Sequence, residues 1–112
     1  MKYYDFCSPP EGITADFAVA VTDDSLLPYF RRGDTVFFRR RVDLRDGDVG
    51  LFCLNGNIVI RQFCEDNYGT VYLFPLNRSR KALDTVHPKD EAKKLVCYGR
   101  LESERQFPLP MD

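Results

Sequence analysis

The stretch Thr22-Asp-Asp-Ser-Leu-Leu-Pro-Tyr-Phe-Arg-Arg-Gly-Asp34 lies between two segments whose apolar residues alternate as they do in β-strands. Residues 17–21 lead into it and residues 35–38 leave it, so the stretch predicts a loop between two neighbouring strands. Within this loop, acidic residues and Ser25 precede the apolar residues 26–30. Side-chain oxygens at such a place accept the free N–H groups of a first helical turn, so we expect one short helical turn over residues 26–30.

A β-hairpin is the clearest local pattern outside this loop. Residues 49–54 have the composition of a strand, and Asn55-Gly56 is a dipeptide that type I′ turns prefer. Residues 57–63 complete the hairpin, and we expect residues 51–54 to pair with residues 58–61. The remaining segments follow from the same criteria. They are strands at 70–74 and 95–101, an irregular or extended connection at 79–86, and a charged connector at 88–93 with room for one helical turn.

Length and composition restrict the class of protein. The chain has 112 residues, 44% of them hydrophobic, and a formal net charge of -1. This suits one domain with one core, and the charge argues against a chain that binds nucleic acid by itself. No apolar run approaches the roughly 20 residues that span a bilayer, and no signal peptide opens the chain, so we expect a cytoplasmic protein without a membrane segment. We divide it into an extended arm (1–14), a domain (15–102) and a polar tail (103–112) that packs loosely or reaches a partner.

Neither the cysteines nor the arginines predict a ligand site. The four cysteines are scattered without a Cys-x-x-Cys pair, and His87 is the only histidine, so we expect free, buried thiols and no metal or cofactor. Six arginines fall between residues 31 and 45, but aspartates are interleaved with them. This balance favours a solvated strand edge over a nucleic-acid surface.

The loop also resembles the nucleophile motif of the self-cleaving repressors, typified by LexA and the lambda-type phage repressors. The usual form there is Gly-Asp-Ser-Met, one residue, Pro, and then Gly-Asp. Here Asp23 stands for the Gly and Leu26 for the Met, while Asp24 keeps the acidic place before the serine. The other matching residues keep the spacing of the motif: Ser25, Pro28, Gly33 and Asp34. The resemblance implies that Ser25 occupies the nucleophile position.

The general-base position differs from that of the resembling family. There the return strand of the hairpin ends in Lys-Arg, and the Lys takes the proton of the serine. Here Arg61 occupies the Lys position and Gln62 the Arg position. A serine hydroxyl is a poor nucleophile without a base, and a guanidinium stays protonated at any ordinary pH. We therefore expect Arg61 to preserve the shape of the site, by bonding Ser25 or pairing with Asp24, without supporting catalysis.

The resemblance covers roughly residues 3–101, including a turn after the strand at 70–74 that holds Asn77. It implies a mostly β fold, a twisted and partly closed antiparallel barrel of the LexA carboxy-terminal and signal peptidase type. The family cleaves an Ala-Gly bond in the region of the arm, and this chain contains no Ala-Gly pair. Because both the bond and the base are missing, the prediction is a catalytically inactive domain that regulates or dimerises a transcriptional repressor.

Several expectations come only with the resemblance. They are a homodimer, DNA binding through a separate helix-turn-helix domain that this chain lacks, and a RecA-type co-protease. Three alternatives remain open. Ser25 is an active nucleophile with an unidentified base, for which His87 is one candidate; the chain is an unrelated β module that binds a ligand or peptide; or Ser25 is only a helix cap.

Overall fold

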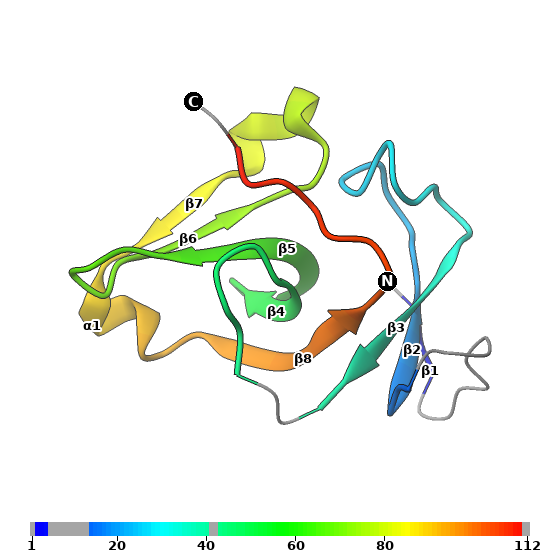
Figure 1. The fold of residues 1–112 in the computed structure, drawn as a ribbon, viewed down its shortest axis with the longest axis horizontal. Helices are drawn as coiled ribbons and strands as arrows, with labels where there is room; N and C mark the ends of the chain where they lie inside the picture. Colours follow the sequence, from blue (N-terminus) through cyan, green and yellow to red (C-terminus); the bar gives the residue numbers. More distant parts are fainter. Residues whose placement is uncertain (1, 5–13, 41–42, 111–112) are drawn as a thin grey trace.

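The computed structural model describes residues 2–4, 14–40 and 43–110 (Figure 1). Within these residues, eight strands form one sheet in the order β1-β2-β3-β8-β4-β5-β6-β7, and every neighbouring pair is antiparallel. The strands are β1 (Lys2–Tyr4), β2 (Phe17–Ala20), β3 (Thr35–Arg39), β4 (Val49–Leu54), β5 (Asn57–Glu65), β6 (Val71–Phe74), β7 (Thr85–His87) and β8 (Val96–Glu102). A 3₁₀ helix, η1 (Arg78–Leu83), and one α-helical turn, α1 (Lys89–Ala92), complete the described elements.

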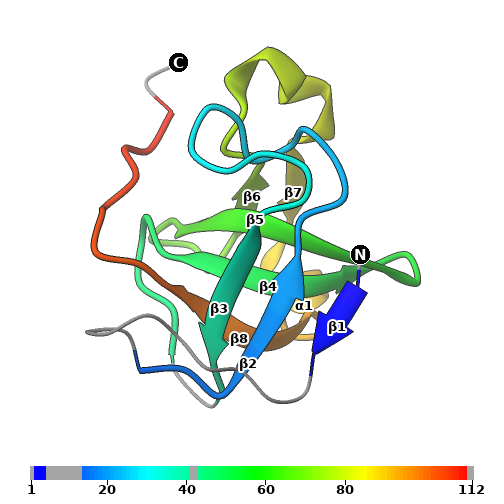
Figure 2. The same cartoon turned by 90° about the vertical axis from the view of Figure 1, so that its right-hand side faces the viewer.

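The sheet is strongly twisted, and the mostly β, antiparallel fold that the sequence predicted is confirmed. In Figure 2, β2 and β3 cross steeply over the direction of β4 and β5. The sheet is not closed, because β1 and β7 stand at its two ends and pair with one neighbour each. In the expected arm, β1 pairs with β2, while residues 1 and 5–13 lie outside the described part.

Strand β8 joins the two halves of the sheet. It enters between β3 and β4, opposing Phe38 with Leu101 on one side and Gly50 with Arg100 on the other. Gly99 is needed at this junction, since a Cβ atom there would lie 2.9 Å from the Arg39 carbonyl oxygen and 3.1 Å from the Phe17 ring. β8 is therefore an inner strand, and both of its edges are occupied in its second half.

The predicted hairpin is present as β4 and β5. Asn55 and Gly56 both have positive φ, at 51° and 82°, as a type I′ turn requires. The register differs by one residue from the expected segments, because a two-residue turn places Leu54 opposite Asn57 and Leu51 opposite Ile60. β5 also continues to Glu65, where its second half pairs with β6.

Most of the core lies on one face of the sheet. Leu51 and Phe52 follow each other on β4 and so point to opposite faces, each into its own buried cluster. Phe52, Val71 and Leu73 form the smaller cluster. The members of the larger one come from β2, β3, β4, β5, β8 and the loops after β2 and β6: Phe17, Val19, Val21, Leu26, Val36, Phe38, Val49, Leu51, Ile60, Leu76 and Leu101.

The carboxy-terminal tail packs on the domain instead of hanging loosely from it. Phe107 contacts Tyr29 edge to face, with ring centroids 4.9 Å apart, and also packs near Phe30. The buried Gln62 amide donates to the Phe107 oxygen at 2.9 Å and to the Gly47 oxygen at 3.1 Å. The expectation of a loosely packed tail is therefore wrong for this segment, because a buried amide and two aromatic rings hold it.

Three smaller expectations also change. Residues 26–30 form a turn and not a helix. The segment 79–86, which was expected to be irregular or extended, is extended at β7 but forms the 3₁₀ helix η1 before it. The charged connector does hold one helical turn, α1. Cys53, Cys64 and Cys97 are free as expected, but Cys97 is exposed and the other two are half-buried; Cys7 lies outside the described residues.

No helix in the described part of the chain is both long and apolar enough to cross a membrane.

Candidate functional site

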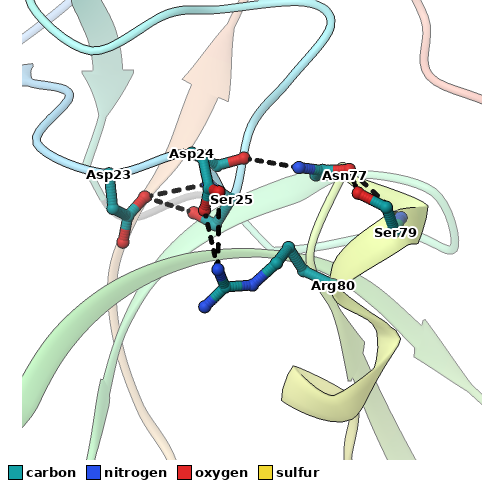
Figure 3. A network of polar contacts seen from close by, with 6 residues as sticks. All are labelled: Asp23, Asp24, Ser25, Asn77, Ser79 and Arg80. Atoms are coloured by element: carbon teal, nitrogen blue, oxygen red, sulfur yellow. Dashed lines mark hydrogen bonds and ion pairs between the residues drawn. The ribbon is translucent and has the colours of Figure 1, made fainter.

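Ser25 lies in the loop between β2 and β3, where Asp23 fixes both of its polar groups. Oδ1 of Asp23 accepts the Ser25 hydroxyl at 2.7 Å and the Ser25 backbone N–H at 3.0 Å (Figure 3). This is an Asx-type turn, in which an aspartate oxygen bonds its own backbone two residues on. The side chain that caps the loop is thus Asp23, and Ser25 is the donor and not the cap that the sequence suggested.

Ser25 is also enclosed, with 1% of its surface exposed. Burial raises the pKa of the Asp23 carboxyl, but the two hydrogen bonds from Ser25 and the charges of Arg61 and Arg80 outweigh it and lower the pKa below its usual value. An ionised carboxylate can only accept hydrogen bonds, so the serine proton points at Asp23. A carboxylate with a lowered pKa is a weak base, and it holds this proton without removing it.

Arg61 comes from β5 and is 6% exposed. Its Nη1 donates to the Ile60 oxygen at 2.9 Å, while its buried Nε has no hydrogen-bond partner among the described residues. Burial lowers the pKa of the Arg61 guanidinium, and the negative charge of Asp23 opposes this shift. Since an arginine pKa starts above about 12, the side chain still remains a cation at neutral pH.

Packing brings the serine loop against β5. Leu26 and Ile60 are both fully buried in the larger core cluster, one beside Ser25 in sequence and the other beside Arg61. Burying such side chains contributes roughly 1.5–3 kcal/mol each. Arg61 is close enough to Asp23 for their charges to shift each other's pKa. Yet, in the part of the chain that the structure describes, no hydrogen bond or ion pair joins Arg61 to Ser25 or to Asp24.

Asp24 has other partners. Its carboxylate lies 3.4 Å from Nη1 of Arg80 in η1, and its backbone oxygen accepts the Asn77 amide at 2.8 Å. The backbone N–H of Asn77 donates to the backbone carbonyl oxygen of Ser25 at 2.9 Å. The Asn77 side chain also caps η1, because its oxygen accepts from Ser79. Figure 3 shows the resulting network between the two loops.

The remaining residues of the motif shape the loop. Gly33 has φ of 96°, a conformation that favours glycine, and its N–H donates to the Val21 oxygen at 2.8 Å. Asp34 Oδ2 accepts the Arg31 N–H at 2.8 Å, and the Asp34 backbone oxygen accepts the Val21 N–H. Pro28 is exposed in the turn. Gly33 and Asp34 thus close the loop that carries Ser25.

Among the described side chains, none other than Asp23 forms a hydrogen bond with the Ser25 hydroxyl, so the structure shows no alternative base there. His87 lies on β7, where its Nε2 is 2.8 Å from the Thr85 hydroxyl, and burial lowers its pKa. The lysines with described side chains, at 81, 89, 93 and 94, form no hydrogen bond with Ser25, whose hydroxyl bonds Asp23. The described residues also contain no group of three or more His, Cys, Asp or Glu that would hold a metal ion.

Sequence reasoning missed three residues of this site. Asp23 was predicted to replace the motif glycine and to help cap a helical turn, but not to bond Ser25, although an Asp two residues before a serine is itself a signal for an Asx turn. Asn77 was noted for its turn, but nothing in the sequence links it to Ser25, because fifty-three residues separate it from Asp24. Arg80 belongs to a segment that was expected to be irregular.

One known protein family matches most of the chain. A family model described as Peptidase S24-like matches residues 5–97, which include the loop of Ser25, the hairpin of Arg61 and the turn of Asn77. No curated protein matches the chain. Because the matched segment covers most of its length, the chain belongs to the Peptidase S24-like family.

Proposed function

We propose that this chain is a catalytically silent Peptidase S24-like domain that serves a LexA- or phage-repressor-like transcriptional regulator through association. The observation that carries the proposal is the environment of Ser25: its hydroxyl donates to a carboxylate of lowered pKa, and the general-base position holds a buried arginine. A general base typically accelerates such chemistry about 10²–10⁴-fold. Neither neighbour supplies that help, so the serine stays protonated.

The enclosure of Ser25 supports the same proposal. A peptidase nucleophile must reach the carbonyl carbon of its substrate, with reacting atoms about 3–3.5 Å apart. Ser25 is 1% exposed, and its loop is bonded to Asn77 on one side and packed through Leu26 on the other. The loop is thus kept as a structural part of the fold.

The association is proposed from family membership together with one surface. Ile58 on β5 and Val96 on β8 both lie opposite Cys53 of β4, so they form a row across three strands. Ile58 is 41% exposed and Val96 is 48% exposed. We propose that a second copy of the chain covers this row, because a symmetric pair suits a regulator that grips two DNA half-sites. DNA contact by a separate helix-turn-helix domain, and any RecA-type co-protease, belong to the same proposal.

The catalytic half of the proposal is tested by incubating the purified chain at pH 7 and pH 10 and measuring its intact mass. Cleavage that depends on a lysine base accelerates at alkaline pH, whereas an arginine site stays intact at both values. The Ser25→Ala variant is the control for contaminating peptidases. Fragments from the unaltered chain that are absent from this variant would contradict the proposal and favour an active self-cleaving peptidase.

The association half is tested by sedimentation velocity over a range of concentrations. We expect a dimer that Val96→Lys weakens, because a charge would be placed in the apolar row. Tyr68→Lys is the matched control, since Tyr68 is 84% exposed in a turn away from this row. A chain that remains monomeric at high concentration would remove the proposed dimer.

A further inference from the structure

Asp23 holds Ser25 through hydrogen bonds that do not involve the arginine at the base position. A single oxygen of Asp23 accepts both the hydroxyl and the backbone N–H of Ser25, at 2.7 and 3.0 Å. The first of these is an O–H···O⁻ bond, a class that is about twice as strong as a neutral one. The second bond, from the Ser25 backbone N–H, ties the backbone of Ser25 to the same carboxylate. A shift of the loop would therefore have to break both bonds.

The neighbouring acidic residue does not share this arrangement. Asp24 directs its carboxylate to Arg80, at 3.4 Å, and its backbone oxygen to Asn77. The two adjacent aspartates therefore bind different groups: Asp23 binds Ser25, and Asp24 binds Arg80 of η1.

We propose that Asp23 is a positioning residue that keeps the Ser25 hydroxyl unreactive, and that the site is consequently blocked twice, by Asp23 and by Arg61. This inference rests on the proposed function, since it concerns why the same site is silent. Nucleophilic attack needs the hydroxyl proton to point at a base, and here it points at a carboxylate that is a weak base. Restoring a lysine at position 61 leaves that hydrogen bond in place, so a lysine alone does not activate Ser25.

The lowered pKa of Asp23 is consistent with this role. Burial alone raises the pKa of this carboxyl, and the Ser25 hydrogen bonds are the first of the influences that reverse the shift. The carboxylate thus stays ionised at neutral pH and remains an acceptor. The other charged groups that face it are Arg61 from β5 and Arg80 from η1, and both favour the ionised form.

A two-by-two set of full-length variants tests the inference, with a fluorophosphonate probe as the reactant. In the labelling step the Ser25 Oγ–P bond forms, the P–F bond breaks, fluoride leaves, and the hydroxyl proton passes to the base. The four chains are the unaltered protein, Asp23→Ala, Arg61→Lys and the double variant. Labelling rates are followed by intact mass, and circular dichroism confirms that each chain is folded.

We expect the double variant to label about 10- to 100-fold faster than Arg61→Lys alone, the range expected for loss of a charge-assisted hydrogen bond. Its rate should rise with pH as the introduced lysine loses its proton, whereas Asp23→Ala alone stays unreactive because no base is present. Asp23→Asn in the Arg61→Lys background should keep a slow rate, because its amide oxygen can still accept the hydroxyl. Asp90→Ala in the same background, which removes an exposed aspartate of α1 outside the site, should leave the slow rate unchanged.

The results that would overturn this inference differ from the result that would overturn the proposed function. If Arg61→Lys labels as fast as the folded double variant, Asp23 does not restrain Ser25, while the silence of the unaltered site stands. If neither variant labels at all, the enclosure of Ser25 and not Asp23 keeps the serine unreactive, and the inference fails while the proposed function stands. If the unaltered chain labels at Ser25, the proposed function itself fails. Should Asp23→Ala not fold, Asp23→Gly takes its place and carries the same expectations.

Discussion

Asn77 donates its side-chain amide to the backbone oxygen of Asp24 over 2.8 Å, and so joins the loop after β2 to the loop after β6. Its backbone N–H adds a second link, to the backbone carbonyl oxygen of Ser25 at 2.9 Å. The position of the serine loop therefore depends on a residue from the opposite part of the sheet. This explains how a loop with no regular secondary structure is held in one place.

Replacing Asn77 by Ala should lower the free energy of unfolding by about 1–3 kcal/mol, because the Asp24 oxygen loses its partner. Urea unfolding followed by circular dichroism measures the change. Asn67→Ala is the matched control, since Asn67 is exposed in the turn before β6, and its effect should stay within about 0.5 kcal/mol. Equal effects of the two substitutions would show that the link contributes nothing.

Phe107→Ala should destabilise the chain by about 1–3 kcal/mol, since the ring packs against Tyr29 and Phe30 but is only partly buried. Thermal and urea unfolding measure the loss. Tyr68→Ala removes an aromatic ring that is 84% exposed and should have little effect. A tail that contributes no stability would give the same small value for both substitutions.

The hydrogen bonds of Asp23 predict a pH dependence. Its pKa in the folded chain is lowered, so it adds stability above the unfolded value of about 3.9, and this stability is lost as the pH falls through the folded value. The unaltered chain should therefore be more stable than Asp23→Asn at pH 7, and the difference should shrink on acidification towards pH 2. A difference that grows at low pH would contradict the direction of the shift.

Arg61→Met should leave the free energy of unfolding unchanged or raise it by about 1 kcal/mol. The buried guanidinium makes one hydrogen bond and leaves Nε without a partner, so its desolvation is poorly compensated. Arg78→Met is the comparison, because Arg78 donates twice to Asp84, at 2.8 and 3.0 Å, and its loss should destabilise the chain. A large loss of stability from Arg61→Met would mean that the charge is better compensated than its contacts indicate.

The sequence predicted the parts of the fold that depend on local patterns. Alternating apolar residues marked β2 and β3, strand-like composition marked β4, and Asn55-Gly56 marked the hairpin turn with its two positive φ angles. The insertion of β8 between β3 and β4 was not predictable, because strand order depends on contacts between distant segments. The packing of Phe107 was missed for the same reason.

The candidate site was predictable in composition but not in hydrogen bonding. The spacing of the motif singled out Ser25 and Arg61, and the structure places both in buried positions. The expected bond between Arg61 and Ser25 is absent among the described contacts: the Ser25 hydroxyl donates to Asp23, and Arg61 donates to the Ile60 oxygen. The motif spacing thus identified the residues of the site, but not the local Asx turn that binds the Ser25 hydroxyl.

The central claim is that no group near Ser25 takes its proton. The most direct measurement is the intact mass of the unaltered chain after prolonged exposure to a fluorophosphonate probe at pH 7 and pH 10, with Ser25→Ala beside it. The account predicts that each protein keeps its own unmodified mass at both pH values. A probe adduct on the unaltered chain that maps to Ser25 and is missing from Ser25→Ala would contradict it.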